Sequence, residues 1–195
     1  MFAENSGSSA CTLADAGYYV GSSGESEQSK CSTGRYSGSG AKDCTKCEVG
    51  RFTDSKGQPS CSLADAGFYV DDEGSSEQSA CPTGRYSGSG ASECTKCDEG
   101  TYANEKSQTS CTLASAGFYV DDEGASKQSE CPAGRYSGSG AAECERCSAG
   151  SYTDSKGQSS CSLADAGKYV DDDGASEQDS CPTGKLALTG LLIFM

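Results

Sequence analysis

The residues best suited to chemistry in this sequence are cysteine pairs in a Cys-x-x-Cys spacing. They are Cys44/Cys47, Cys94/Cys97 and Cys144/Cys147. Two such pairs bind zinc when they lie about 15–20 residues apart. Here successive pairs are 50 residues apart, other cysteines intervene and histidine is absent. A redox role would require a helix N-terminus or several basic neighbours beside the thiol, and a single lysine such as Lys96 does not supply them. We therefore interpret these cysteines as structural disulfides.

Consecutive acidic residues recur every 50 positions and are the candidates for calcium ligation. They are Asp71, Asp72, Glu73, Asp121, Asp122, Glu123, Asp171, Asp172 and Asp173. An EF-hand loop alternates its ligands with spacer residues and ends in a glutamate, which these runs do not. Consecutive acids in turns more often keep a surface solvated. We therefore assign no metal and no cofactor, and keep a calcium-dependent matrix or cell-wall component as an alternative function.

Catalysis is not indicated by the polar residues. Without histidine, proton transfer would fall to Asp, Glu, Lys, Tyr or Cys, and every polar cluster here recurs in several copies, whereas a catalytic site is usually unique. "SGSG" at 87–90 lacks the Lys-Ser/Thr that completes a phosphate-binding loop. The net charge of −14 argues against nucleic acid and anionic lipid as partners. We expect a protein that is not an enzyme.

The elements that position the cysteines cannot depend on a large apolar core. Leu, Ile, Val and Phe together number 19 of 195 residues, against 14 Cys and 26 Gly. A chain this polar and this charged does not bury enough apolar surface to offset the loss of backbone entropy. Small modules with little core are usually held by disulfides, which persist outside the cell or in the secretory pathway.

The cysteines repeat with a period of 50 residues, in units that start at Cys11, Cys61, Cys111 and Cys161. Within each unit a Gly-x-aromatic step, such as Gly84/Tyr86, recurs every 16 or 17 residues. Three modules of ~17 residues therefore fill one unit. In two of the three, one cysteine opens the module three residues before the glycine and another closes it 13 or 14 positions later.

The third module has lost both cysteines together. The opening and closing positions hold Ala14/Gln28, Ala64/Gln78, Ala114/Gln128 and Ala164/Gln178. If these two cysteines had been bonded to other cysteines, their joint loss would have left those partners unpaired. If they had been bonded to each other, no other cysteine is affected. This supports the hypothesis that each module pairs its own cysteines, as Cys31–Cys44, Cys47–Cys61, Cys81–Cys94, Cys97–Cys111, Cys131–Cys144 and Cys147–Cys161. Closing such a loop removes roughly 3 kcal/mol of unfolded-state entropy.

These features predict a small, disulfide-rich, irregular β fold with little helix. The glycine turns the chain after the opening position, and "SGSG" and the acidic "DDEG" at 71–74 are expected to be turns between short strands. We expect the ~17-residue modules, grouped in 50-residue repeats, to form an elongated solenoid-like array. In such an array each module contacts only its neighbours.

The stretch "CPTGRYSGSGASECTKCDEGTY" at 81–102 resembles the tyrosine-protein kinase ephrin type A/B receptor-like cysteine-rich repeat, within the growth-factor-receptor cysteine-rich group. The shared motif is Cys-Pro-x-Gly-x-Tyr, a Gly/Ser/Ala-rich turn and Cys-x-x-Cys. The module is also similar to the opening module of tumour-necrosis-factor receptor domains. The resemblance covers about residues 11–184, and it implies disulfide-bonded extracellular modules that serve as spacers or ligand-contact surfaces, with a protein or glycan as ligand and no kinase activity.

The two ends depart from this pattern. Residues 1–10 are expected to be a disordered or truncated end and show no signal peptide, and the apolar tail 185–195 has the character of a gene-model artefact. Its last ten residues are half the length of a membrane span, so no direct membrane insertion is expected from this segment. Cys11 and Cys181 have no predicted partner in the chain. Their partners would lie beyond the sequence, or they are free or pair between chains.

The sequence thus favours a non-enzymatic extracellular spacer or scaffold, part of a larger secreted or cell-surface protein. The main alternative is the ligand-binding ectodomain of a membrane receptor, in which several modules present one surface for protein binding. The two interpretations differ in their tolerance of change: a spacer tolerates the exchange of a 50-residue unit, whereas a receptor depends on particular side chains such as Phe68 or Phe118.

Overall fold

The structure is a computed structural model that describes residues 2, 10–185, 187–188 and 191–192. Within these residues there is no helix, and each strand is two residues long and pairs antiparallel with one partner. The strand pairs are β1 (Tyr18–Tyr19) with β2 (Ser29–Lys30), β3 (Arg35–Tyr36) with β4 (Thr45–Lys46), β5 (Arg51–Phe52) with β6 (Ser62–Leu63), β7 (Phe68–Tyr69) with β8 (Ser79–Ala80), β9 (Arg85–Tyr86) with β10 (Thr95–Lys96), β11 (Thr101–Tyr102) with β12 (Thr112–Leu113), β13 (Phe118–Tyr119) with β14 (Ser129–Glu130), β15 (Arg135–Tyr136) with β16 (Glu145–Arg146), β17 (Ser151–Tyr152) with β18 (Ser162–Leu163), β19 (Lys168–Tyr169) with β20 (Asp179–Ser180), and β21 (Ala187–Leu188) with β22 (Leu191–Leu192). The predicted class, tandem disulfide-rich modules of irregular β structure, is confirmed.

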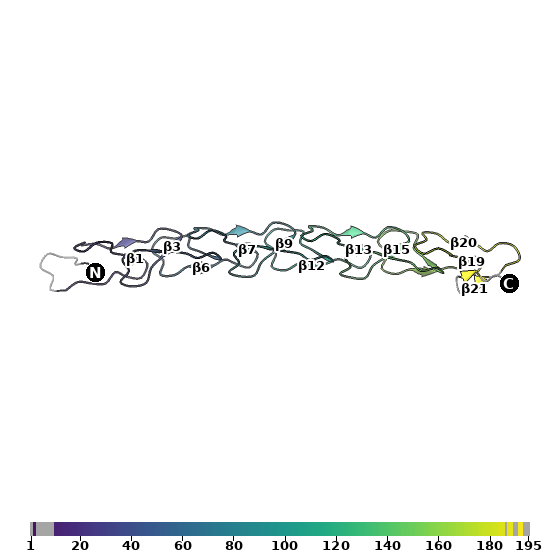
Figure 1. Ribbon diagram of the computed structural model, residues 1–195, viewed down its shortest axis with the longest axis horizontal. Coiled ribbons are helices and arrows are strands. Elements are labelled where there is room, and N and C mark those ends of the chain that lie inside the picture. Colours follow the sequence, from purple (N-terminus) through teal and green to yellow (C-terminus); the bar gives the residue numbers. More distant parts are fainter. Residues whose placement is uncertain (1, 3–9, 186, 189–190, 193–195) are drawn as a thin grey trace. The chain divides into compact units, whose positions relative to one another are not determined.

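The described part of the chain divides into two compact units, and the hairpins follow one another in sequence order along each of them (Figure 1). The first unit comprises Met1–Pro82 with Tyr86–Thr95 and Lys106–Thr109. The second comprises Thr83–Arg85, Lys96–Glu105 and Ser110–Met195. Each hairpin from β1–β2 to β19–β20 belongs to one module of the sequence.

Each module enters its first strand through a tight turn that ends on the repeated glycine. In the module of residues 114–130 the Phe118 amide donates to the Ser115 carbonyl at 2.9 Å, and Gly117 between them has a φ of +86°. Side chains other than glycine rarely adopt this conformation because their Cβ crowds the backbone. The chain then runs through the aromatic residue, around a second turn and back to the closing position.

Successive modules stack through four backbone hydrogen bonds. Between the modules 114–130 and 131–146, the Gly117 amide donates to Ser137 O and the Val120 amide donates to Ala141 O, at 2.8 and 3.0 Å. In the other direction, the amides of Cys131 and Gly140 donate to the carbonyls of Gly117 and Ala114, at 2.9 and 2.8 Å. The same four bonds recur at other junctions within each unit, because they use backbone atoms of every module.

Each module also contacts the module after the next one. A Cβ built on Gly117 would lie 2.0 Å from the carbonyl oxygen of Gly157, which is 40 residues further on. The same approach relates Gly17 to Gly57 in the first unit. The expectation that a module touches only its immediate neighbours was therefore wrong. The absence of a side chain at the entry glycine lets two backbones come together across an intervening module.

The buried interior is narrow and consists of small side chains. The opening cysteines, the opening alanines such as Ala114, and the valines such as Val120 are buried. Serine, threonine or, in one module, Ala103 takes the place of valine in the disulfide-bonded modules, as at Ser137 and Thr153, and these side chains are also buried. Among the described residues, every buried side-chain nitrogen or oxygen has a hydrogen-bond partner. The sequence expectation of a chain without a large apolar core agrees with this interior.

Most of the two terminal segments singled out in the sequence lies outside the described residues. In the segment 1–10, Phe2 is buried and exchanges two backbone hydrogen bonds with Thr12, at 2.8 and 2.7 Å. In the segment 185–195, the described strands β21 and β22 pair with each other, Ala187 opposite Leu192 and Leu188 opposite Leu191.

Candidate functional site

Six disulfides join the opening and closing positions of the cysteine-containing modules. They are Cys31–Cys44, Cys47–Cys61, Cys81–Cys94, Cys97–Cys111, Cys131–Cys144 and Cys147–Cys161, with Cα–Cα distances of 5.7–5.8 Å. The structure thus brings together the same six pairs that the joint loss of two positions pointed to. The six opening cysteines are fully buried, so each disulfide lies at the centre of its module and serves as part of its core.

A glutamine occupies the place of the closing sulfur in the disulfide-free modules. In the module 114–130, the Ser115 amide donates to Gln128 Oε1 at 2.6 Å, and Gln128 Nε2 donates to Ser115 Oγ at 3.3 Å. Gln28 and Gln78 make the same pair of contacts with Asp15 and Asp65. The glutamine therefore connects the two ends of its hairpin by hydrogen bonds where the other modules have a covalent bond.

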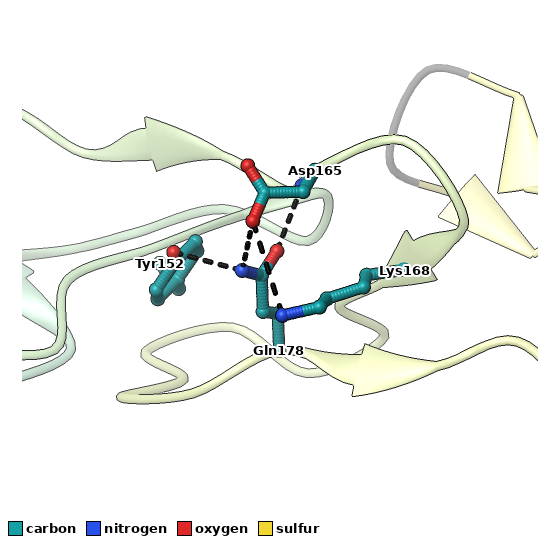
Figure 2. A network of polar contacts seen from close by, with 4 residues as sticks. All are labelled: Tyr152, Asp165, Lys168 and Gln178. Carbon is teal, nitrogen blue, oxygen red and sulfur yellow. Dashed lines mark hydrogen bonds and ion pairs between the residues drawn. The ribbon is translucent and has the colours of Figure 1, made fainter.

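The last of these modules links its glutamine to the preceding module as well. Gln178 Nε2 donates to Asp165 Oδ2 at 2.6 Å and to the Tyr152 hydroxyl at 3.0 Å (Figure 2). Lys168 Nζ lies 3.9 Å from the same carboxylate oxygen, Asp165 Oδ2 (Figure 2). Asp165 is exposed, the other three side chains are half-buried, and the polar groups of the cluster are paired with one another. The cluster stabilises the hairpin and offers no unpaired group for chemistry.

The "GRYSGSGA" motif, which repeats at 34–41, 84–91 and 134–141, is used for stacking. Ser137 Oγ donates to the Phe118 carbonyl at 2.8 Å, and Ser139 Oγ donates to the Ala114 carbonyl at 3.0 Å. Arg135 Nη1 donates to the Cys144 carbonyl at 2.8 Å, and a Cβ at Gly140 would meet Leu113 at 3.1 Å. The sequence predicted that this glycine-rich run is a turn between short strands and not a phosphate loop. Its role as the contact surface for the preceding module required the structure.

The acidic runs lie on exposed turns of the disulfide-free modules. The side chains at 71–73, 121–123 and 171–173 are all exposed. The turn of residues 120–129 surrounds a shallow hollow of about 470 Å³, and the corresponding turn 170–179 surrounds one of about 350 Å³. Among the described residues, no three His, Cys, Asp or Glu side chains come together as metal ligands would. One of the carboxylates, that of Asp173, accepts a hydrogen bond from the Ala149 amide at 2.9 Å.

The remaining candidates are single residues at the surface. Cys11 is exposed and Cys181 is half-buried, and neither forms a disulfide in the structure. Phe68 and Phe118 are half-buried on their hairpins, so the residue between the glycine and the aromatic does not simply point to solvent. Leucines at the module ends are more exposed, including Leu113 at 59% and Leu163 at 77%.

One ionisable side chain is distinguished by a neighbour that differs between repeats. The Tyr136 hydroxyl donates to Glu145 Oε2 at 2.8 Å. This hydrogen bond and the charge of the carboxylate raise the pKa of Tyr136 above its ordinary value of 10.0. Thr45 and Thr95 occupy the place of Glu145 in the earlier repeats. The contact that raises this pKa therefore belongs to one copy of the repeat.

Among the described residues, no helix is long and apolar enough to cross a membrane. The comparison with curated proteins finds no match. The family model described as "Tyrosine-protein kinase ephrin type A/B receptor-like" matches residues 34–81, 84–131 and 134–181, which is most of the chain. These repeats are non-catalytic, disulfide-bonded and typical of extracellular regions of proteins, and together with the disulfides they suggest the secretory pathway. The chain belongs to the ephrin receptor-like cysteine-rich repeat family.

Proposed function

We propose that residues 11–184 act as a non-enzymatic spacer or scaffold within a larger secreted or cell-surface protein. The observation that carries this proposal is the use of the repeated polar groups in contacts between modules. In the repeated motif, Ser137 and Ser139 donate hydrogen bonds to carbonyls of the preceding module. Because these side chains form the same contacts at equivalent junctions, the length of the array depends on the number of repeats. A spacer requires a length of this kind.

The surface supports the same proposal. Its acidic turns and its net charge of −14 keep an array of this kind soluble and separate from acidic polymers. The exposed leucines occur once in each 50-residue repeat, and isolated surface leucines are normal in soluble proteins. A ligand-binding role would instead require a few side chains that form one contiguous recognition surface.

A display experiment separates the spacer from the receptor ectodomain. The full chain is placed between a membrane anchor and a peptide epitope on cultured cells, and binding of an antibody to the epitope is measured. Deletion of residues 64–113 removes one repeat and joins Leu63 to Ala114, which preserves the order of the modules. For a spacer we expect lower antibody access after the deletion, because the epitope is held closer to the crowded cell surface. Equal access before and after the deletion would contradict the spacer.

Two matched variants complete this test. Replacing residues 61–110 by a second copy of 111–160 keeps the length and every cysteine position but changes many exposed side chains. Phe118→Lys introduces the residue that Lys168 already provides in an equivalent hairpin, β19, so the fold should tolerate it. Both variants should leave antibody access unchanged. The receptor interpretation gains support if the labelled chain binds cells saturably and Phe118→Lys removes that binding.

A further inference from the structure

Disulfides divide the covalent chain into stretches that can lengthen under tension and stretches that cannot. The bonded cysteines Cys81–Cys94 and Cys97–Cys111 lie 13 and 14 positions apart in the sequence, and each bridge holds its two Cα atoms 5.7 Å apart. A pulling force on the chain passes through the sulfur atoms and leaves the enclosed loops slack. Between Cys61 and Cys81 no disulfide intervenes, so the force there acts on the backbone of the module that carries alanine and glutamine.

That module is held by non-covalent contacts alone. In the copy at 64–80, β7 and β8 pair over two residues each, and Gln78 accepts a hydrogen bond from the Asp65 amide and donates one to its carboxylate, both at 2.7 Å. Stacking adds the Gly67 amide bond to Ser87 O at 2.9 Å. These bonds can break and re-form without any change in covalent structure. The disulfide-bonded hairpins cannot be drawn out beyond their bridges.

We infer that the array is a tension-bearing tether whose extension is set by the disulfide-free module, an inference that rests on the proposed spacer role. In one 50-residue repeat the two bridges bypass 13 and 14 of the Cα–Cα steps along the chain, which leaves 23 steps to be drawn out. At about 3.5 Å per extended residue, this stretch and the two bridges span about 90 Å. The fully reduced repeat would span about 175 Å. The disulfide-free module thus unfolds and refolds as the tension changes, and the disulfides fix the maximum extension of the repeat.

The substitution of cysteine by alanine and glutamine in every third module is the sequence feature that creates this behaviour. With cysteines at positions 114 and 128, the spacing would equal the 14 residues of Cys97–Cys111, and the repeat would lose about 45 Å of extension. A chain with a bridge in every module would keep about half of this extended span, about 50 Å per repeat. The present pattern combines stiff segments with one extensible segment per repeat.

Single-molecule force spectroscopy on the full chain, held between two handles, tests this inference. Reduction and alkylation of all six disulfides should increase the fully stretched length by about 250 Å, because the enclosed residues are released. Ala114→Cys with Gln128→Cys should shorten the stretched oxidised chain by about 45 Å, after a peptide map has shown the new bridge. Both quantities are differences between two forms of one chain, so the handles and the ends cancel.

A control pair distinguishes the bridge from the loss of the glutamine. Ala114→Ser with Gln128→Ser should open at lower force and keep the stretched length of the unmodified oxidised chain. The inference is overturned if oxidised and reduced chains reach the same length, or if the oxidised chain breaks its handles before the glutamine modules extend. Either result would leave the spacer proposal standing, because the display experiment measures how epitope access depends on repeat number and applies no force.

Discussion

Gly117→Ala is the sharpest test of the contact between a module and the module after next. The new Cβ would lie 2.0 Å from the Gly157 carbonyl oxygen and 2.5 Å from its carbon. A carbon and a carbonyl oxygen in contact are usually about 3.3–3.6 Å apart, so one backbone must move by more than 1 Å, on the order of the difference between these distances. Neither partner is a flexible side chain that could turn away.

The displacement acts on three backbone hydrogen bonds. The Gly117 amide donates to Ser137 O, the Cys131 amide donates to Gly117 O and the Gly157 amide donates to Cys131 O, at 2.8, 2.9 and 2.8 Å. At about 1 kcal/mol each, their loss costs about 3 kcal/mol. The positive φ of +86° at Gly117 adds about 1 kcal/mol for alanine. We expect Gly117→Ala to destabilise the local structure by about 4 kcal/mol.

Gly157→Ala provides the matched control. Gly157 also has a positive φ, of +72°, but a Cβ there would meet nothing within 4 Å. Only the backbone strain of about 1 kcal/mol should remain. Amide hydrogen exchange measures the difference at the Cys131 amide, which should exchange about 100-fold faster in Gly117→Ala than in Gly157→Ala. Equal exchange in the two variants would refute the close approach and the argument built on it.

Three further predictions concern substitutions at one or two positions. Ser107 has a φ of +59° where the other repeats have glycine, so Ser107→Gly should stabilise the chain by about 0.5–1 kcal/mol in urea unfolding, and a loss of stability would contradict this. Ala114→Cys with Gln128→Cys should add about 3 kcal/mol to the free energy of unfolding through loop closure and remove about 1 kcal/mol through the lost hydrogen bonds. The net gain should appear as a higher Tm once a peptide map shows the new bridge, and an unchanged or lower Tm would contradict it. Glu145→Thr should lower the pKa of Tyr136, followed by tyrosinate absorbance. The raised pKa means that the Tyr136 contact stabilises the fold below pH 10 and is lost as pH rises through the tyrosine titration, and an unchanged titration after Glu145→Thr would count against the contact.

The sequence allowed the positions of the hairpins to be predicted because each module repeats its local chemistry. Entry glycines such as Gly117 mark the turns, and the joint loss of cysteine at Ala114 and Gln128 indicated which positions face each other across a module. Both signals are local in the chain. They depend on a spacing of 13 or 14 residues within one loop, which repetition makes visible.

The contacts between modules could not be predicted in the same way. Nothing in the spacing of Ser137 and Ser139 shows that their hydroxyls donate to carbonyls about 20 and 25 residues earlier, since this depends on how one hairpin lies on another. The approach of Gly117 to Gly157 is hidden for the same reason. The role of Gln128 was also missed, although its recurrence with Ala114 in every repeat was the signal that could have revealed it.

The contact that skips a module has a consequence for how such genes can change. Because Gly117 meets Gly157 across two module boundaries, and Leu113 contacts Gly140 of a differently built hairpin, inserting or removing one module would place unlike neighbours against each other. Duplication or loss of a block of 50 codons keeps the order of the three module types, so each module still contacts modules of the same types as before. Unequal recombination that adds or removes complete 50-codon repeats would therefore change the length of the protein and leave the contacts between modules the same.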